Sequence, residues 1–250
     1  GDETIGTLIA EAVANAGKDG AITIEESRSL KTSLDVVEGF QFEGGYVSSQ
    51  FVTDERRAVV EYRDALVLVT DETLDNVEEL LPILEVVARD GRPFIIIAEE
   101  IEGQLLAALI MNRMRNGMKI AAVKAPRYGE ERRWLLEDLS IVTGATLISK
   151  ESPIRLKDVK LQHLGSVKRV EVGKGRTTLA DGQTDHDRLE EKIESIKNMI
   201  EDADDLREAQ SLQDRITRLS SAVAVIRVGG ATEIEVTEKK HRIEDALEAV

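Results

Sequence analysis

Apolar and polar residues follow two alternating patterns along the middle of the chain. Short runs rich in β-branched residues predict strands at 65–69, 93–97, 120–123 and 145–149. Between these runs, apolar positions repeat with helical period over residues 74–89, 101–115 and 130–142. Strands that alternate with helices are joined by crossover connections. The middle region therefore predicts an α/β domain with a mostly parallel sheet flanked by helices.

The pattern changes after residue 150. Short polar β-like pieces with glycine turns come first and predict a less regular segment. From about His186 the apolar spacing becomes 4-3-4, which predicts an antiparallel helical hairpin over residues 186–219.

The two ends of the chain carry short elements that do not make a closed core alone. The N-terminal end predicts a helix stopped by Gly17 and Gly20 and then a strand at 21–26. The C-terminal end predicts strands at 222–228 and 232–236 and a helix from about Lys239. We expect the two ends to pack together as a small α+β module into which the α/β domain is inserted.

Charge and composition exclude several classes of partner. The chain has 33 Lys and Arg against 48 Asp and Glu, a net charge of −15, which opposes binding to nucleic acid or to an anionic membrane. No apolar run approaches the roughly 20 residues that span a bilayer, and the N-terminal end lacks a basic leader. We expect a soluble, unexported protein.

The chain also lacks the residues for metal or thiol chemistry. It has no cysteine, which removes disulfides, thiolate catalysis and Cys-ligated metal. His163, His186 and His241 lie far apart without a second ligand at helical spacing, so no metal site is expected.

Two of the predicted helices have more apolar surface than a sheet can cover. On a helical wheel, residues 101–115 spread apolar side chains over an arc of about 240°, whereas a helix on a sheet needs about 100°. Residues 74–89 show the same excess. Burial on both sides is one explanation. A groove for apolar polypeptide segments is the other, and Met111 and Met114 would make it adaptable to different partners.

Two alternatives rest on other features. The sequence GKGRTT at 173–178 resembles a phosphate loop only loosely and favours a β-turn, but it leaves open an α/β enzyme that acts on a small phosphorylated ligand. The hairpin at 186–219 leaves open a scaffold that self-associates through Leu189 and Leu212.

Long strings of the sequence are similar to one known family. They are TIGTLIAEAVANAGKDGAITIEE, LDVVEGFQFEGGYVSSQF, LLPILEVVARDGRPFIIIAEEIEGQLLAALIMNRMRNGMKIAAVKAP and AVAVIRVGGATEIEVTEKKHRIEDAL. The chain resembles the large subunit of the group I chaperonins, the bacterial GroEL class, along all 250 residues with almost no gaps.

The resemblance implies a domain organisation. Residues 39–221 correspond to the apical polypeptide-binding domain, and residues 1–38 and 222–250 to two segments of an incomplete intermediate domain. The equatorial ATPase domain is expected to be absent from this chain. The full-length parent is then a protein-folding ATPase that uses ATP and Mg²⁺, whereas this chain alone should bind no cofactor and be inactive as an enzyme.

The resemblance also implies binding residues and partners. Unfolded polypeptides and a cochaperonin bind an apolar groove, and sister subunits form a ring. The groove positions are Tyr46, Phe51, Leu81, Leu84, Leu106, Ile110 and Met111. The polar rim positions are Glu85, Asn112 and Arg115.

Three further positions are implied outside the groove. Gly39 and Ala222 correspond to hinge positions between the two domains. Asp245 corresponds to a catalytic carboxylate that acts only together with the equatorial domain. The resemblance implies a cytoplasmic protein, with an organelle matrix or a phage-infected host as alternatives.

The chain departs from the family pattern in three places. Gln50 stands where the family often has tyrosine, and Arg127 stands where it commonly has glycine. Ser221 and Ala222 replace a glycine pair. We expect the first change to remove an aromatic contact, and the last to restrict a hinge that needs left-handed backbone conformations.

Overall fold

The computed structural model describes residues 2–16, 21–126 and 128–249, which fold into two compact units. One unit is formed by residues 1–39 and 220–250, and the other by residues 40–219. The sequence predictions on Gly17, Gly20 and Arg127 lie outside the described residues. Among the described helices, none has both the length and the apolarity that crossing a bilayer requires.

The larger unit is built on a mixed sheet, and its α/β class is as predicted. Parallel pairing joins β3 (Val60–Thr70), β5 (Phe94–Ala98) and β7 (Ile120–Lys124), and β8 (Leu147–Ile148) also pairs parallel with β3. On the other side of β3 the sheet is antiparallel through β9 (Gly165–Val172) and β10 (Arg176–Gly182). β10 is followed in the sheet by β2 (Ser33–Glu43). A small parallel pair links β4 (Thr73–Leu74) with β6 (Glu100–Ile101).

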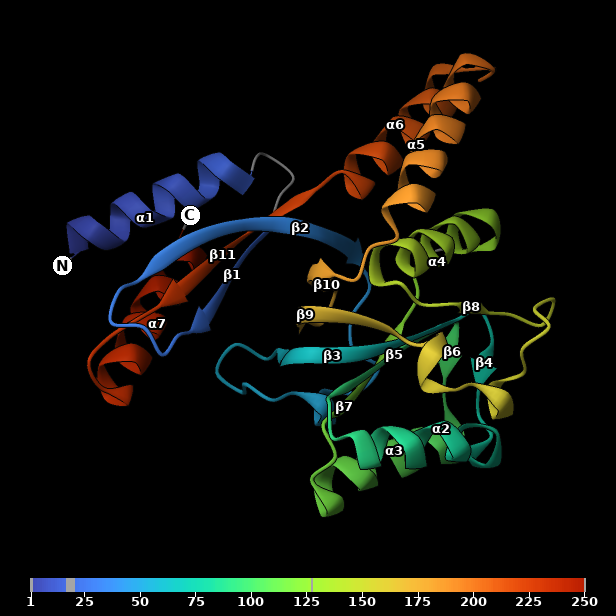
Figure 1. Cartoon of the computed structure of the whole chain (residues 1–250), viewed down its shortest axis with the longest axis horizontal. Helices are drawn as coiled ribbons and strands as arrows, with labels where there is room; N and C mark the ends of the chain where they lie inside the picture. Colours follow the sequence, from blue (N-terminus) through green and yellow to red (C-terminus); the bar gives the residue numbers. More distant parts are fainter. Residues whose placement is uncertain (1, 17–20, 127, 250) are drawn as a thin grey trace. The chain divides into compact units, whose positions relative to one another are not determined.

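Helices cover both faces of this sheet (Figure 1). α2 (Val77–Asp90) and α3 (Gly103–Asn116) lie on one face, and α4 (Gly129–Thr143) lies on the other. Because the central strands are covered on both sides, all five residues of β5 are buried, which explains the uninterrupted apolar run of its sequence. Short 3-10 turns are η1 (Ser49–Phe51), η2 (Leu156–Asp158) and η3 (Leu161–His163).

The predicted hairpin is present as α5 (His186–Glu201) and α6 (Leu206–Leu219). Its apolar seam is buried inside the chain, with Ile196, Leu212 and Leu219 in the main core. The Asp138 carboxylate of α4 accepts two hydrogen bonds from the Arg215 guanidinium of α6, from Nε and Nη2, each at 2.8 Å. The same guanidinium lies 5.2 Å from the ring centre of Trp134.

This ion pair is almost fully buried, with 1% of the Asp138 side chain and 6% of the Arg215 side chain exposed. Burial raises the pKa of the Asp138 carboxyl above its ordinary value, and the hydrogen bonds from Arg215 oppose that rise. The pair therefore fixes the hairpin to α4. Removal of either side chain would leave the other charge buried without a partner.

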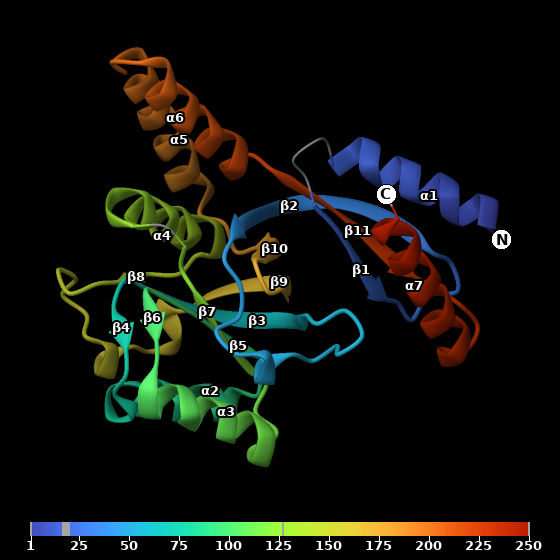
Figure 2. The same cartoon turned by 180° about the vertical axis from the view of Figure 1, so that it is seen from behind.

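The smaller unit brings the two ends of the chain together. β11 (Ala222–Val228) pairs parallel with β1 (Ala21–Glu26) and antiparallel with the first part of β2. α1 (Asp2–Ala16) and α7 (Glu233–Glu248) pack on these strands and on each other. Figure 2 shows the same arrangement from behind. Its separate core consists of Ile9, Ala12, Ile24, Ala224, Ile226, Val228, Val236 and Ile243.

One prediction for this region was wrong, and one strand was not predicted. Residues 232–236 form the start of α7 rather than a strand, because the Thr232 hydroxyl accepts a hydrogen bond from the Glu235 N–H at 3.1 Å and caps the helix. The Glu235 carboxylate in turn accepts a hydrogen bond from the Ala231 N–H at 3.0 Å. The long strand β2 was not predicted, because most of its positions are exposed or half-buried and give no clear period.

Candidate functional site

α2 and α3 each bury one stripe of side chains and keep apolar side chains on the opposite face. Leu80, Ile83 and Val87 of α2 and Leu105 and Leu109 of α3 point into the core. On the outer face, Leu81 is 44% exposed, Met111 50% and Met114 65%. We call these three residues, together with the half-buried Leu106 and Ile110, the α2–α3 surface. It is the part of the predicted groove where apolar side chains reach solvent.

Two predicted groove residues do not belong to this exposed surface. Phe51 is fully buried in the main core, and Leu84 is only 7% exposed. Leu84 lies on the buried stripe of α2, one turn after the buried Leu80. The expectation that these two side chains are displayed was therefore wrong. They support the surface from beneath, while Tyr46 is half-buried against the core.

Leu81 and Leu84 of α2 differ in burial, and this difference gives a prediction about stability. Leu84→Ser should lower the free energy of unfolding by about 2–5 kcal/mol, because it leaves a cavity and a hydroxyl in the core. Leu81→Ser should change it by about 0.5 kcal/mol or less, because the site is exposed. Urea unfolding of both variants measures the contrast. Equal losses would mean that Leu81 is also a core residue.

The segment before β3 is fixed to α3 by one side chain. Ser48 caps η1 by accepting a hydrogen bond from the Gln50 N–H at 3.2 Å. The Arg113 guanidinium of α3 then donates to the Val52 carbonyl at 2.8 Å. Burial raises the pKa of the Tyr62 hydroxyl, and a hydrogen bond with Arg113 opposes that rise. The sequence analysis did not predict that Arg113 holds this segment. The only sign of it in the sequence is that Arg113 interrupts the apolar arc of α3.

The predicted rim residues differ in exposure and in hydrogen bonding. Glu85 and Arg115 are exposed on α2 and α3. The Asn112 side chain is half-buried and donates to the Ala108 carbonyl at 2.8 Å, one turn earlier in the same helix. Asn112 also accepts a hydrogen bond from the Asn116 side chain at 2.9 Å. Its amide is thus partly committed to α3 itself.

The positions implied as hinge and catalytic residues lie in the smaller unit. The Gly39 N–H donates to the Ser221 carbonyl at 3.1 Å, and Ala222 pairs with Glu38 at the start of β11. Ala222 is thus in an extended strand, a conformation that alanine adopts without strain. Asp245 is exposed on α7.

The GKGRTT sequence forms the turn between β9 and β10. A strand follows it, so it has no helix N-terminus to hold a phosphate. The Gly173 N–H donates to the Arg176 carbonyl at 2.8 Å, and the Gly44 N–H donates to the Gly175 carbonyl at 3.0 Å. A neighbouring cavity of about 370 Å³ contains Lys174, Lys124 and Arg132 in its lining. Lys124 already pairs with Glu100 there, at 2.7 Å.

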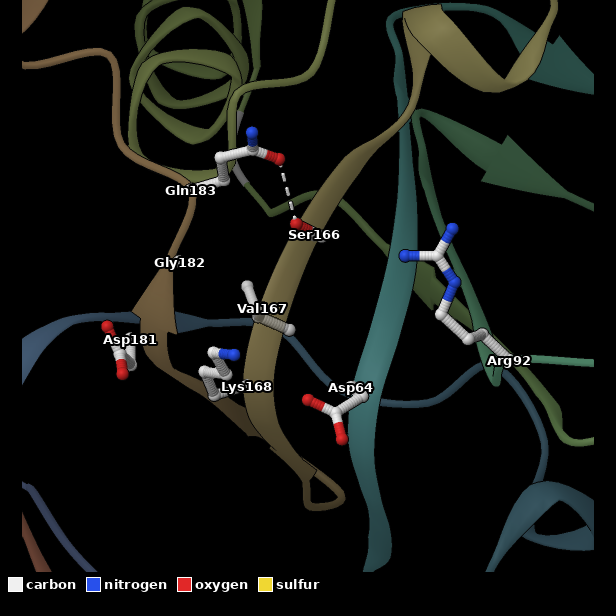
Figure 3. A pocket seen from close by; sticks show the side chains of 8 residues that line it. All are labelled: Asp64, Arg92, Ser166, Val167, Lys168, Asp181, Gly182 and Gln183. Atoms are coloured by element: carbon white, nitrogen blue, oxygen red, sulfur yellow. Dashed lines mark hydrogen bonds between the residues drawn. The ribbon is translucent and has the colours of Figure 1, made fainter.

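A second cavity, of about 290 Å³, lies over β3, β9 and β10 (Figure 3). It is lined by polar side chains, among them Asp64, Lys168 and Asp181. Asp64 and Asp181 both have left-handed backbone conformations, with φ of 51° and 54°. The Ser166 hydroxyl donates to the Gln183 side chain at 3.1 Å. These groups give this cavity a different chemistry from the apolar α2–α3 surface.

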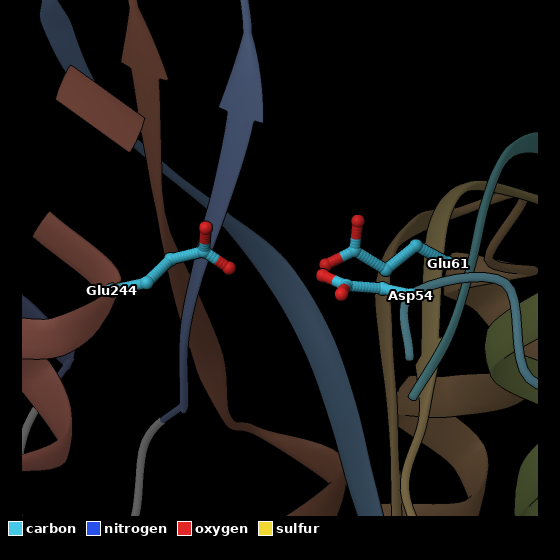
Figure 4. Close-up of side chains that lie close together, drawn as sticks. All are labelled: Asp54, Glu61 and Glu244. Carbon is cyan, nitrogen blue, oxygen red and sulfur yellow. The ribbon is translucent and has the colours of Figure 1, made fainter. Parts of the chain in front are cut away.

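Carboxylates also gather near the start of β3, as Figure 4 shows. Carboxylate oxygens of Asp54 and Glu61 lie within 4.8 Å of each other. Glu61 accepts a hydrogen bond from Arg57 at 2.6 Å and faces Arg169 at 3.5 Å, so cations balance its charge. Glu244, drawn in the same figure, is a buried residue of α7 in the smaller unit.

The sequence model of the TCP-1/cpn60 chaperonin family matches residues 1–250. The chain belongs to this chaperonin family. Membership shows a chaperone role in protein folding, and unfolded substrates and oligomeric assemblies are general features of such chaperonins. The exposed apolar side chains of α2 and α3 thus lie on a protein whose family handles unfolded chains.

Proposed function

We propose that this chaperonin chain is the apical and intermediate part of a group I subunit. Its α2–α3 surface binds non-native polypeptides and, in competition with them, an apolar segment of a cochaperonin. The larger unit takes the apical role and the smaller unit the intermediate role. In the full-length parent, sister subunits form a ring in the cytoplasm.

One observation carries this proposal: two adjacent helices expose large apolar side chains in addition to the stripes that they bury in the core. Leu81, Met111 and Met114 are each between 44% and 65% exposed, although both helices bury a complete second stripe. Non-native chains expose apolar side chains without a fixed geometry. Thioether side chains repack around such varied partners, which suits binding without sequence specificity.

The positions outside this surface take roles in the full-length parent. Gly39 and Ala222 lie where the chain passes between the two units and form the hinge of the proposed rotation. ATP and Mg²⁺ bind to the equatorial domain of the parent. The exposed carboxylate of Asp245 completes that nucleotide site when the domains close. This chain alone is then a binding protein without ATPase activity.

The phosphorylated-ligand enzyme is less well supported, because the GKGRTT turn leads into a strand and its backbone is paired with Gly44. The scaffold alternative is weakened by the hairpin seam, since Leu212 is 1% exposed within the chain.

The proposed function predicts capture of unfolded protein without nucleotide. The 250-residue chain at a few-fold molar excess should suppress light scattering from a chemically denatured protein on dilution, with or without ATP. Native protein should not be captured, because its apolar side chains are buried. Undiminished aggregation would reject the binding role.

A further inference from the structure

The α2–α3 surface lies between groups of opposite charge at its two ends. α2 carries Glu78 and Glu79 in its first turn, and α3 has Glu102 at its N-cap. Arg89 lies in the last turn of α2, and Arg113 and Arg115 lie in the last turn of α3. α2 also ends on Asp90, whose carboxylate pairs with Arg92 at 2.7 Å, so the charge of Arg89 is left over at that end. Each helix is therefore acidic at its beginning and basic at its end.

The two helices point in the same direction. α2 connects β3 to β5 and α3 connects β5 to β7, and these three strands are parallel neighbours. Two crossover helices on one face of a parallel sheet run parallel to each other. Their acidic beginnings thus lie at one end of the α2–α3 surface, and their basic ends at the other.

The charges share the exposed stripes with the apolar residues. On α2, Glu78, Leu81, Glu85 and Arg89 follow each other at intervals of three and four residues, and all four are exposed. On α3, Ala107, Met111 and Arg115 follow each other at intervals of four residues, Met114 lies three residues after Met111, and all four are exposed. A segment bound to Leu81 and Met111 would therefore lie within reach of both charged ends.

The side-chain charges dominate the field of the helices themselves. Two helix N-termini together carry about one positive charge, which the carboxylates of Glu78, Glu79 and Glu102 outweigh. Charges of both signs lie near the beginning of α2: burial and the charges of Asp71 and Glu79 raise the pKa of Glu72, and the charges of Lys150 and Arg155 oppose that rise. At the basic end Arg113 is engaged with the Val52 carbonyl, whereas Arg89 and Arg115 are exposed.

We propose that the α2–α3 surface prefers polypeptide segments whose charge changes sign across a short apolar run, and that it orients them with their basic end over the first turns of α2 and α3. This inference rests on the proposed polypeptide-binding function. Glu78 and Arg89 are eleven residues apart, or about 16 Å along the helix. An extended segment covers that distance in about five residues. The preferred occupant is an extended stretch of about five apolar residues with lysines before it and glutamates after it, or the reverse.

Three labelled peptides with one apolar core test this preference. One has lysines at one end and glutamates at the other, one has lysines at both ends, and one has glutamates at both ends. At low salt the dipolar peptide should bind the chain about three- to tenfold more tightly than either of the others, and the difference should fall as salt is added. A nitroxide at its lysine end should broaden the amide signals of the first turn of α2.

A charge-reversal variant provides the reciprocal test. Arg89→Glu with Arg115→Glu should make the doubly basic peptide the tightest ligand. Arg188→Glu with Arg207→Glu, which changes two exposed hairpin arginines by the same total charge, should leave the order unchanged. Equal binding of all three peptides, or tightest binding of the doubly basic peptide to the unmodified chain, would overturn this inference alone. Failure of every peptide to bind would overturn the proposed function and the inference with it.

Discussion

Replacing Arg215 by alanine is expected to lower the free energy of unfolding of the larger unit by about 3–5 kcal/mol. The substitution removes both hydrogen bonds to Asp138 and leaves that carboxylate buried without its cation. The chain has a single tryptophan, Trp134, which lies against the Arg215 guanidinium. Urea unfolding followed by tryptophan fluorescence therefore measures the loss at the site where it arises.

The matched control is Arg207→Ala, because Arg207 is an exposed arginine of the same helix. It should change the free energy of unfolding by about 0.5 kcal/mol or less. The double variant Asp138→Leu with Arg215→Met removes both charges together and should recover most of the loss. Equal stability of Arg215→Ala and Arg207→Ala would show that the buried pair does not hold the hairpin.

The loss in Arg215→Ala should also depend on pH. A carboxyl group whose folded-state pKa is raised stabilises the fold below its unfolded pKa, and this contribution is lost as the pH rises through the raised value. Without Arg215, burial raises the pKa of Asp138 further, because the opposing hydrogen bonds are gone. The deficit relative to the unmodified chain should thus be smaller at about pH 5 than at pH 7. An equal deficit at both would mean that the buried charge is not its cause.

Replacing both Leu81 and Met111 by serine is expected to weaken capture of unfolded protein by about tenfold to a hundredfold. Each side chain is about half exposed, and full burial of such a side chain contributes about 1.5–3 kcal/mol. Loss of roughly half that amount at two sites corresponds to this change in affinity. Binding of a labelled, permanently unfolded polypeptide measures it directly. The melting temperature should change little, because both residues lie on the outer face.

Leu206→Ser is the control for this pair. Leu206 is 89% exposed at the start of α6 in the same unit, so it is more accessible than either surface residue. If exposed apolar area alone determined capture, this change would weaken binding as well. We expect it to have no effect, because Leu206 belongs to α6 and not to the α2–α3 surface. A loss equal to that of the double variant would contradict a defined binding surface on α2 and α3.

Most strand and helix positions in the larger unit followed from local pattern, although β9 and β10 are regular strands where a less regular segment was expected. The apolar run at 93–97 predicted a strand, which the structure places at Phe94–Ala98; helices cover both of its faces, so it has no polar side. The surplus apolar arc of α3 left open burial on both sides or an exposed groove, and the structure leaves Met111 in solvent. The 4-3-4 spacing after His186 predicted the hairpin for the same reason: each feature depends on residues that are close in sequence.

The exposure of individual side chains was decided by tertiary packing. Leu81 and Leu84 are equally apolar and lie on one helix. Leu84 is buried and Leu81 is exposed because of which side of α2 faces the sheet. Phe51 is buried because α3 and β7 pack against its short turn. The periodicity of a helix sets the width of its apolar arc, but it does not determine which part of that arc faces the sheet.

The sequence by itself determined an α/β domain inserted between two terminal segments and a resemblance to the chaperonins, because periodicity and long matching strings are local properties of the chain. Only the tertiary structure decided that Asp138 and Arg215, 77 residues apart, form a buried pair. It also decided that the equally charged beginnings of α2 and α3 lie at one end of a shared surface. Such pairings depend on which distant segments the sheet brings together, and hydrophobic burial sets that arrangement without leaving a signal at either position alone.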